Sequence, residues 1–270
     1  MPTTTATMTV APASRIAKLP VVTKKPTKSA VTTLRSLYNR AAKAFLQRDA
    51  VLTQSLLLSA FLNLHSPSSH LPDPLSSHRR KWDILRITLE TTLYTSGQST
   101  TTVPEELKPL LALSPPSFIS TLHARSLQLF TPANRAKPSA EFLPSQILIT
   151  LVLASVKLDC AQMGREVIED WLSRRNQSGF DVYKESKQLA DEVEGYEKVL
   201  EVYCLHILPR LNDWEYAREF LRYESELSED RRSVRDLIIP EIVSAEYFTV
   251  SCRVTRTSSF RPYTKRGEGA

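Results

Sequence analysis

Three segments of the chain carry apolar residues at helical spacing on both sides of a short polar turn. Spacing of three and four residues places such side chains on one face of a helix. An Asp or Asn between two stripes favours a turn and can cap the helix that follows. The sequence therefore predicts three helical hairpins, in residues 33–64, 143–177 and 196–221, with turns at Asp49, Asp159 and Asn212–Asp213.

The stripes differ in character from one hairpin to the next. Residues 147–156 are apolar almost throughout, but a membrane-spanning helix needs about 20 such residues. We therefore expect a buried helix at the centre of the fold. In the third hairpin the first helix carries an apolar stripe, and the second helix carries another that faces it. The first stripe is Tyr196, Val199, Leu200, Tyr203 and Ile207, and the second is Trp214, Ala217, Phe220 and Leu221. In the first hairpin, Leu52, Leu56, Ala60 and Leu64 mark the second helix.

Further helices are predicted between the first two hairpins. Residues 81–95 carry one stripe, and residues 116–130 carry another, with Pro116 near the helix start. The composition of residues 65–80 and 96–117 predicts loops, the second of which holds a short helix near Pro104. The tryptophans Trp82, Trp171 and Trp214 each lie on an apolar stripe, so we expect them in the core.

These elements predict an all-α fold, a helical-hairpin repeat in the manner of a TPR-like α-solenoid. The turns at Asp159 and Asp213 are 54 residues apart, and a degenerate unit around Tyr94 to Pro104 would make the spacing regular. Residues 1–30 are predicted to be a disordered basic arm, residues 31–238 the helical-repeat domain, and residues 239–270 a polar basic tail that is also disordered.

Charge is distributed unevenly along the chain. Residues 1–48 contain nine Lys or Arg and no acid, whereas residues 159–230 contain 18 acids and nine bases. The basic arm could contact acidic lipid, acidic protein or nucleic acid, or it could be a solvated tail. Its acid-poor, Thr- and Ser-rich composition is also typical of a mitochondrial presequence.

The sequence contains no motif for catalysis, cofactor binding or metal binding. It lacks the HExxH, GxGxxG, GxxxxGK[ST] and GxSxG patterns, and only six glycines are present. The spacing of Cys160, Cys204 and Cys252 fits no zinc site, so we expect reduced thiols. We therefore predict no enzyme, no cofactor, no metal and no small-molecule substrate.

The remaining polar candidates favour structural or docking roles. His65, His70 and His78 fall in or beside a predicted loop, where solvent exposure is expected, and His206 lies among apolar positions, which favours an interior or edge histidine. The segment His78–Trp82 (HRRKW) combines bases with an aromatic ring at an expected helix start. It is a candidate exposed docking site for an acidic protein or a nucleic acid.

Two stretches resemble the peroxin-26 family: residues 41–61 (AAKAFLQRDAVLTQSLLLSAF), and residues 165–175 followed by 195–221. The resemblance implies an all-helical cytosolic domain that docks the AAA-type ATPase pair of peroxins 1 and 6 at the peroxisomal membrane, where that ATPase recycles the import receptor for matrix proteins. It also implies a membrane-spanning tail anchor. After Asp236 this sequence has no run of about 20 apolar residues, so we expect a cytoplasmic protein if the chain has no anchor.

The helix predicted over residues 34–45 (LRSLYNRAAKAF) is the partner-binding candidate, with Arg35, Tyr38, Arg40 and Lys43 as its site residues. Two alternatives stay open. One is a helical-repeat scaffold or nucleic-acid binder that uses the basic arm, and the other is a mitochondrial assembly factor from which residues 1–30 are cleaved.

Overall fold

The computed structural model describes residues 28–67, 73–96, 103–175 and 186–224. The α-helices in these ranges are α1 (Lys28–Leu46), α2 (Ala50–Phe61), α3 (Ser76–Ser96), α4 (Lys108–Leu111), α5 (Pro115–Phe130), α6 (Ser145–Lys157), α7 (Ala161–Arg175), α8 (Ser186–Val202) and α9 (Trp214–Tyr223). Short helical turns are η1 (Glu105–Leu107), η2 (Ala140–Phe142) and η4 (Pro209–Leu211), and η3 (Tyr203–Ile207) is a π-helix. The described ranges contain no strand, which confirms the all-α class there.

The predicted arm and tail fall mostly outside the described residues. Residues 1–27 and 225–270 are not described, and these include nearly all of the arm and the whole of the predicted tail at 239–270. The first helix begins at Lys28, close to the predicted start of the helical domain at residue 31. Within the described part of the chain, no helix combines the length and apolar character needed to cross a membrane.

All three predicted hairpin turns are confirmed, and they share one backbone geometry. Arg48, Asp159 and Asn212 have φ values of 60°, 56° and 60°, in the left-handed region. In each turn the next residue donates its N–H to a carbonyl five residues back: Asp49 to Ala44, Cys160 to Ser155, and Asp213 to Leu208. This is the Schellman pattern, which closes a helix by satisfying carbonyls that its last turn leaves free. The Asp49 carboxylate then caps α2 by accepting the N–H of Leu52 at 2.9 Å.

A further antiparallel pair lies between the first two hairpins. Tyr94 near the end of α3 stacks on Phe118 near the start of α5, with ring centroids 4.4 Å apart. Near their other ends, Asp83 on α3 accepts a hydrogen bond from Ser126 on α5. The pair lies where the sequence spacing suggests a degenerate unit, although α4 joins its helices in place of a tight turn.

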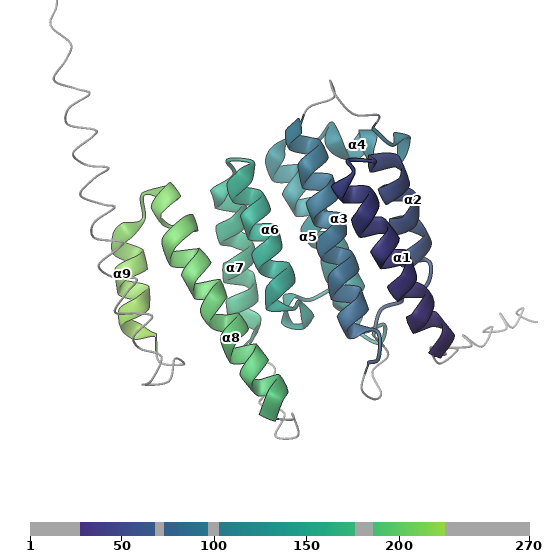
Figure 1. Cartoon of the computed structure of the whole chain (residues 1–270). Helices are drawn as coiled ribbons and strands as arrows, with labels where there is room; N and C mark the ends of the chain where they lie inside the picture. The colour runs from purple at the N-terminus through teal and green to yellow at the C-terminus, as the bar shows by residue number, and fades with distance from the viewer. Residues whose placement is uncertain (1–27, 68–72, 97–102, 176–185, 225–270) are drawn as a thin grey trace, which may run out of the picture.

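The helices stand side by side in a row, from α2 and α1 at one end to α9 at the other (Figure 1). Helix α6 lies in the middle and packs against α3, α5, α7 and α8, as its apolar sequence predicts. Its side chains Ile147, Leu148 and Leu151 are fully buried. The three tryptophans are also buried, as expected.

Two details differ from the sequence prediction. Residues 76–80, predicted as loop, form the first turns of α3, because Asp73 accepts the N–H of Leu75 at 3.0 Å and so opens the helix earlier. Of the residues predicted to mark the second helix, Leu64 lies beyond α2, which ends at Phe61, and Leu52 is exposed. The buried face of α2 is formed instead by Ala50, Thr53, Gln54, Leu56, Leu57 and Ala60.

Candidate protein-docking surface

The four predicted partner-binding residues of α1 do not share one face. Tyr38 is half-buried, and its ring packs edge-on against the buried Trp82 of α3 with centroids 5.4 Å apart. Arg40 is exposed on α1 and lies two residues away, about 200° around the helix from Tyr38. Lys43 follows Arg40 by three residues, so these two bases share an exposed face.

Arg35 belongs to a different part of the α1 surface. It is exposed and acts electrostatically on His78 near the start of α3. Burial, Lys81 and Arg35 together lower the pKa of His78, in that order of importance. Of the predicted set, Arg40 and Lys43 therefore remain together as candidates, Arg35 lies apart, and Tyr38 holds α1 to α3.

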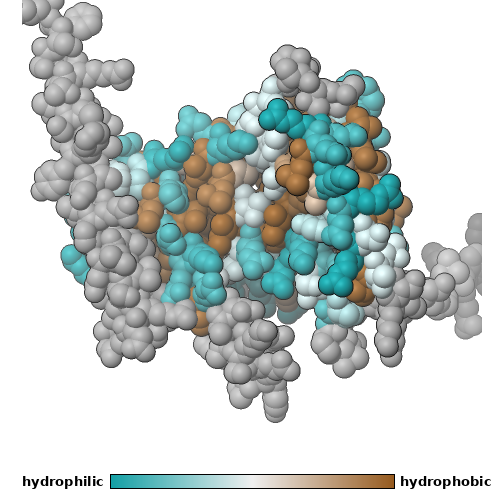
Figure 2. All heavy atoms as spheres, viewed as in Figure 1, coloured by the Kyte–Doolittle hydropathy of each residue, from teal (hydrophilic) through white to brown (hydrophobic). Residues whose placement is uncertain are grey.

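Helix α2 exposes large apolar side chains that the sequence analysis did not identify. Val51, Leu58 and Leu62 are 50%, 48% and 78% exposed. Their spacing of seven and four residues aligns them on one face, and Leu46 at the end of α1 is exposed beside the same turn. We call Val51, Leu58 and Leu62 the α2 stripe. The α2 edge of the molecule shows brown apolar side chains next to teal polar ones (Figure 2).

The α2 stripe arises because this helix is apolar on nearly every side and has only Ser55 and Ser59 as exposed polar residues. A helix at the surface normally has a polar face, and one that is apolar all round is normally buried. Helix α2 packs against α1 and α3, and nothing in the described ranges covers its third side. A sequence signal was present in Leu56-Leu57-Leu58, which places leucine on more of the helix circumference than one neighbour can bury.

The α1–α2 hairpin is also strongly basic. Residues 28–61 contain five bases and one acid, a net charge of +4. Arg40, Lys43 and Arg48 are exposed on it. We call the α2 stripe together with Arg40 and Lys43 the α1–α2 surface. Its chemistry suits an apolar helix with acidic residues beside its apolar face.

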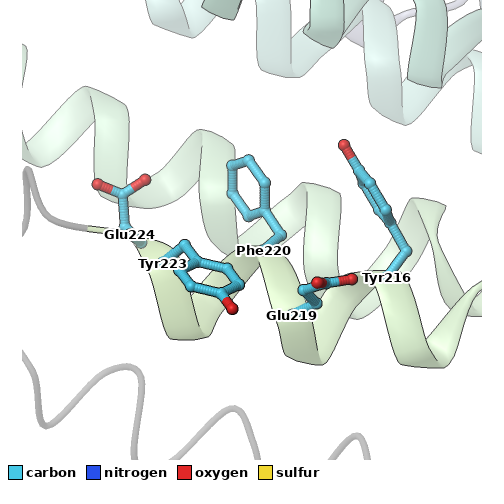
Figure 3. Close-up of a pocket in the computed structure, with 5 residues that line it drawn as sticks. All are labelled: Tyr216, Glu219, Phe220, Tyr223 and Glu224. Carbon is cyan, nitrogen blue, oxygen red and sulfur yellow. The ribbon is translucent and has the colours of Figure 1, made fainter.

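A second exposed surface lies at the other end of the molecule, on α9. Tyr216, Glu219, Phe220, Tyr223 and Glu224 line a shallow pocket along this helix (Figure 3). Tyr223 is 73% exposed and Tyr216 is also exposed, while Phe220 packs edge-on against Tyr203 with centroids 5.6 Å apart. We call Tyr216, Phe220 and Tyr223 the α9 face.

Polar contacts fix the α9 face to the helices behind it. The Arg165 guanidinium of α7 pairs with Glu169 and Asp213 and lies 5.1 Å from the centre of the Tyr216 ring. These carboxylates raise the pKa of Arg165, so it stays charged. The Tyr203 hydroxyl donates to Glu169 at 2.7 Å, and burial followed by this contact raises the pKa of Tyr203.

The structure places two buried carboxylates on α3 that the sequence analysis missed. Asp83 accepts a hydrogen bond from Ser126 at 2.7 Å and lies 2.6 Å from Arg86, while Glu90 lies 3.3 Å from Arg125. Burial is the main cause of the raised pKa of both acids. Both side chains are enclosed between helices, where a substrate has no approach, so we assign them to the joining of α3 and α5. The sequence contained a signal for these buried acids, because Asp83 and Glu90 are seven residues apart and lie beside an apolar stripe.

The prediction of an exposed docking site at His78–Trp82 is wrong for Arg79. Arg79 is buried, because its guanidinium donates to the carbonyl of His65 at 2.7 and 3.1 Å and pairs with Asp73. Arg79 therefore holds the segment that precedes α3 against the helix through its contacts with His65 and Asp73. His78 is half-buried in the helix and is not a loop residue.

The other polar candidates have ordinary environments. His206 is exposed on η3 next to the buried Ile207, so of the two predicted placements the interior one is wrong. His65 is exposed as expected, and His70 lies outside the described residues. Cys160 and Cys204 are free thiols, and burial raises the pKa of Cys204 to about 12. Cys252 lies outside the described residues.

In comparisons with known proteins, no family model matches the chain, and no curated protein or solved structure matches it significantly. The resemblance to the peroxin-26 family stays a prediction from the sequence, and the candidate site depends on the geometry of α1 and α2.

Proposed function

We propose that this chain is an adaptor that docks another protein through the α1–α2 surface. The helical pairs would form a TPR-like array that carries no reaction of its own and needs no cofactor. On the resemblance to the peroxin-26 family, the partner is the AAA-type ATPase pair of peroxins 1 and 6. The place of docking would then be the cytosolic face of the peroxisomal membrane, where the ATPase recycles the import receptor.

The exposed α2 stripe is the observation that carries this proposal. Val51 and Leu58 of α2 and its C-cap residue Leu62 are each about half exposed or more. Covering each of them contributes about 1–2 kcal/mol of binding free energy, since full burial of such a side chain is worth about 1.5–3 kcal/mol. A partner that covers all three gains enough for specific docking, and the bases on α1 would steer an acidic partner toward it.

A protein partner accounts for the α2 stripe better than a nucleic acid does. Phosphate backbones are bound by Lys and Arg, and aliphatic leucines supply neither charge nor a stacking surface. The basic arm, on which the nucleic-acid alternative depends, lies mostly outside the described residues. A mitochondrial role likewise depends on residues 1–30.

The test is capture of the purified peroxin-1 and peroxin-6 complex by the full chain and by the Leu58→Asp/Leu62→Asp variant. Because charge replaces apolar contact, we expect at least a tenfold loss of affinity, about 1.4 kcal/mol or more. Leu153→Asp is the matched control, since Leu153 is 47% exposed on α6 and stands apart from the stripe. Equal capture by the stripe variant, with its thermal unfolding unchanged, would remove this surface from the proposal.

The charged part of the surface is tested separately with Arg40→Glu/Lys43→Glu. Exposed charges mainly steer association, so we expect a loss of about threefold at low salt that fades as salt is raised. Lys157→Glu on α6 controls for the change in net charge, because Lys157 is an exposed base elsewhere. Tyr38 stays unchanged in this variant because its substitution would loosen α1.

A further inference from the structure

Within the described residues, both ends of the row of helices expose large apolar or aromatic side chains. Arrays of stacked helical pairs normally end in units with a polar outer face, which keeps the terminal helices soluble. Here α2 lies at one end of the row and α9 at the other (Figure 1). The first exposes the α2 stripe, and the second exposes Tyr216 and Tyr223 of the α9 face. Each end therefore presents side chains of the kind that a neighbouring helix would cover.

The two ends carry opposite charge of equal size. The α1–α2 hairpin, residues 28–61, has five bases and one acid, a net charge of +4. Residues 186–224, which hold α8 and α9, have nine acids and five bases, a net charge of −4. An attraction between unlike ends and a repulsion between like ends follow from this distribution.

We propose that copies of this chain associate end to end, with the α2 stripe of one copy packed on the α9 face of the next. The contact is heterologous, because it joins two different surfaces. Leucine and valine side chains of α2 would pack on the tyrosine rings of α9, while basic residues of α1 face the acids of α8 and α9. The terminal helices of neighbouring copies thereby continue the row of helices.

The α9 face is prepared for such a contact. Tyrosine loses little side-chain entropy on binding and offers a large, partly apolar ring. The Tyr216 ring is already held by Arg165, and Glu224 accepts a hydrogen bond from the Tyr196 hydroxyl at 2.6 Å. The surface is therefore ordered before any partner arrives, which lowers the entropic cost of covering it.

Charge selects this arrangement over a symmetric dimer. A contact between two α2 stripes would bring together two hairpins of net charge +4, and a contact between two α9 faces would bring together two segments of net charge −4. Only the unlike pairing removes both apolar surfaces from water without like-charge repulsion. The inference does not depend on the ATPase, although a copy stacked on α2 would compete with any protein that docks there.

The experiment is sedimentation of the full chain, the Leu58→Asp/Leu62→Asp variant and the Tyr223→Asp variant at increasing concentration in about 0.1 M salt. The wild-type chain should form species larger than 30.5 kDa in a concentration-dependent manner, and about 1 M salt should weaken them. Each variant alone should remain monomeric, because each has lost one end. Leu153→Asp should associate like the wild type.

An equimolar mixture of the two variants gives the decisive result. One variant retains an intact α9 face and the other an intact α2 stripe, so the mixture should form dimers of twice 30.5 kDa and nothing larger. A wild-type chain that stays monomeric at every concentration would overturn the inference. So would a Tyr223→Asp variant that still associates by itself, since that outcome indicates an α2-to-α2 contact.

A separate measurement distinguishes failure here from failure of the proposed function. The Tyr223→Asp variant keeps the α1–α2 surface, so its capture of the ATPase complex should equal that of the wild type whether or not copies stack. If Tyr223→Asp instead lowers the melting temperature of a chain that is monomeric, residues of the same chain cover the α9 face, and the inference is wrong.

Discussion

The α1–α2 and α6–α7 hairpins are built alike but are covered differently. Each contains one helix that is apolar on nearly every side, α2 in the first and α6 in the second. Each turns through a left-handed residue closed by the same Schellman hydrogen bonds, at Arg48 and at Asp159. Helix α6 packs against four helices, α3, α5, α7 and α8, whereas the main neighbours of α2 in the described ranges are α1 and α3.

It follows from this difference that an apolar sequence alone does not show that a helix is central in the fold. The sequence of α2 is that of a helix with neighbours on all sides, yet it lies at the end of the row (Figure 1). Most of the apolar surface of α6 is buried within the chain, with Leu148 and Leu151 fully enclosed, so these leucines contribute to folding, and Leu153 is the exposed exception. The leucines of the α2 stripe contribute little to folding and are available for binding.

The largest predicted effect is a contrast between two leucines. Leu151→Ala on α6 should lower the free energy of unfolding by about 3 kcal/mol, because Leu151 is fully buried and its removal leaves a cavity. Leu58→Ala on α2 should lower it by less than about 1 kcal/mol, because half of that side chain is already in water. Urea unfolding of both variants measures the contrast. Equal losses would mean that the α2 stripe is buried within the folded chain.

A smaller effect is expected at Gly164, where the central hairpin has no spare room. A Cβ at this position would lie 2.4 Å from the Oγ of Ser155 on α6 and 2.8 Å from the Cδ1 of Ile207 on η3. Gly164→Val should therefore destabilise the fold by about 2 kcal/mol through overpacking, as measured by urea unfolding. In a Ser155→Ala background the loss should be smaller, since one of the two clashes is gone. A loss unaffected by Ser155→Ala would place the strain elsewhere.

The hairpins could be predicted from the sequence because their signals are local. Helical spacing and a polar turn residue occupy adjacent positions, so Asp49, Asp159 and Asn212 mark the turns without knowledge of the fold. The central place of α6 also follows from its own composition. These features need no information about which helix packs against which.

The candidate site could be predicted only in part, because it depends on which helix lies last in the row. The run Leu56-Leu57-Leu58 indicates more leucine than one neighbour can bury, but it does not tell which side of the helix lacks a neighbour and leaves Leu58 and Leu62 exposed. Nothing in the residues around Tyr38 shows whether it is buried. Its ring is half-buried because it packs against Trp82 of another helix. Arg79 is buried because a carbonyl from the preceding loop and Asp73 satisfy its guanidinium.

The smallest predicted effect concerns the two turns. A side chain in the left-handed region costs about 1 kcal/mol for most residues and less for Asp, whose short polar side chain tolerates it. Arg48→Gly should therefore stabilise the chain by about 0.5–1 kcal/mol, because the Cβ strain is relieved and the Arg48 side chain is exposed. Asp159→Gly should change stability by less than half as much, because Asp tolerates the left-handed conformation. The loss of its contact with Arg210 adds little, since that pair is 3.9 Å apart and the Asp159 carboxylate is exposed.

Thermal unfolding of the two glycine variants compares the turns directly. Both substitutions also make the unfolded chain more flexible, which opposes the gain by a similar amount at each site, so the difference between them isolates the strain in the folded turn. A larger gain at Arg48 than at Asp159 would show that the edge hairpin keeps a strained residue in its turn. Equal changes would show that strain is not what separates the two hairpins, and coverage of α2 would remain as their difference.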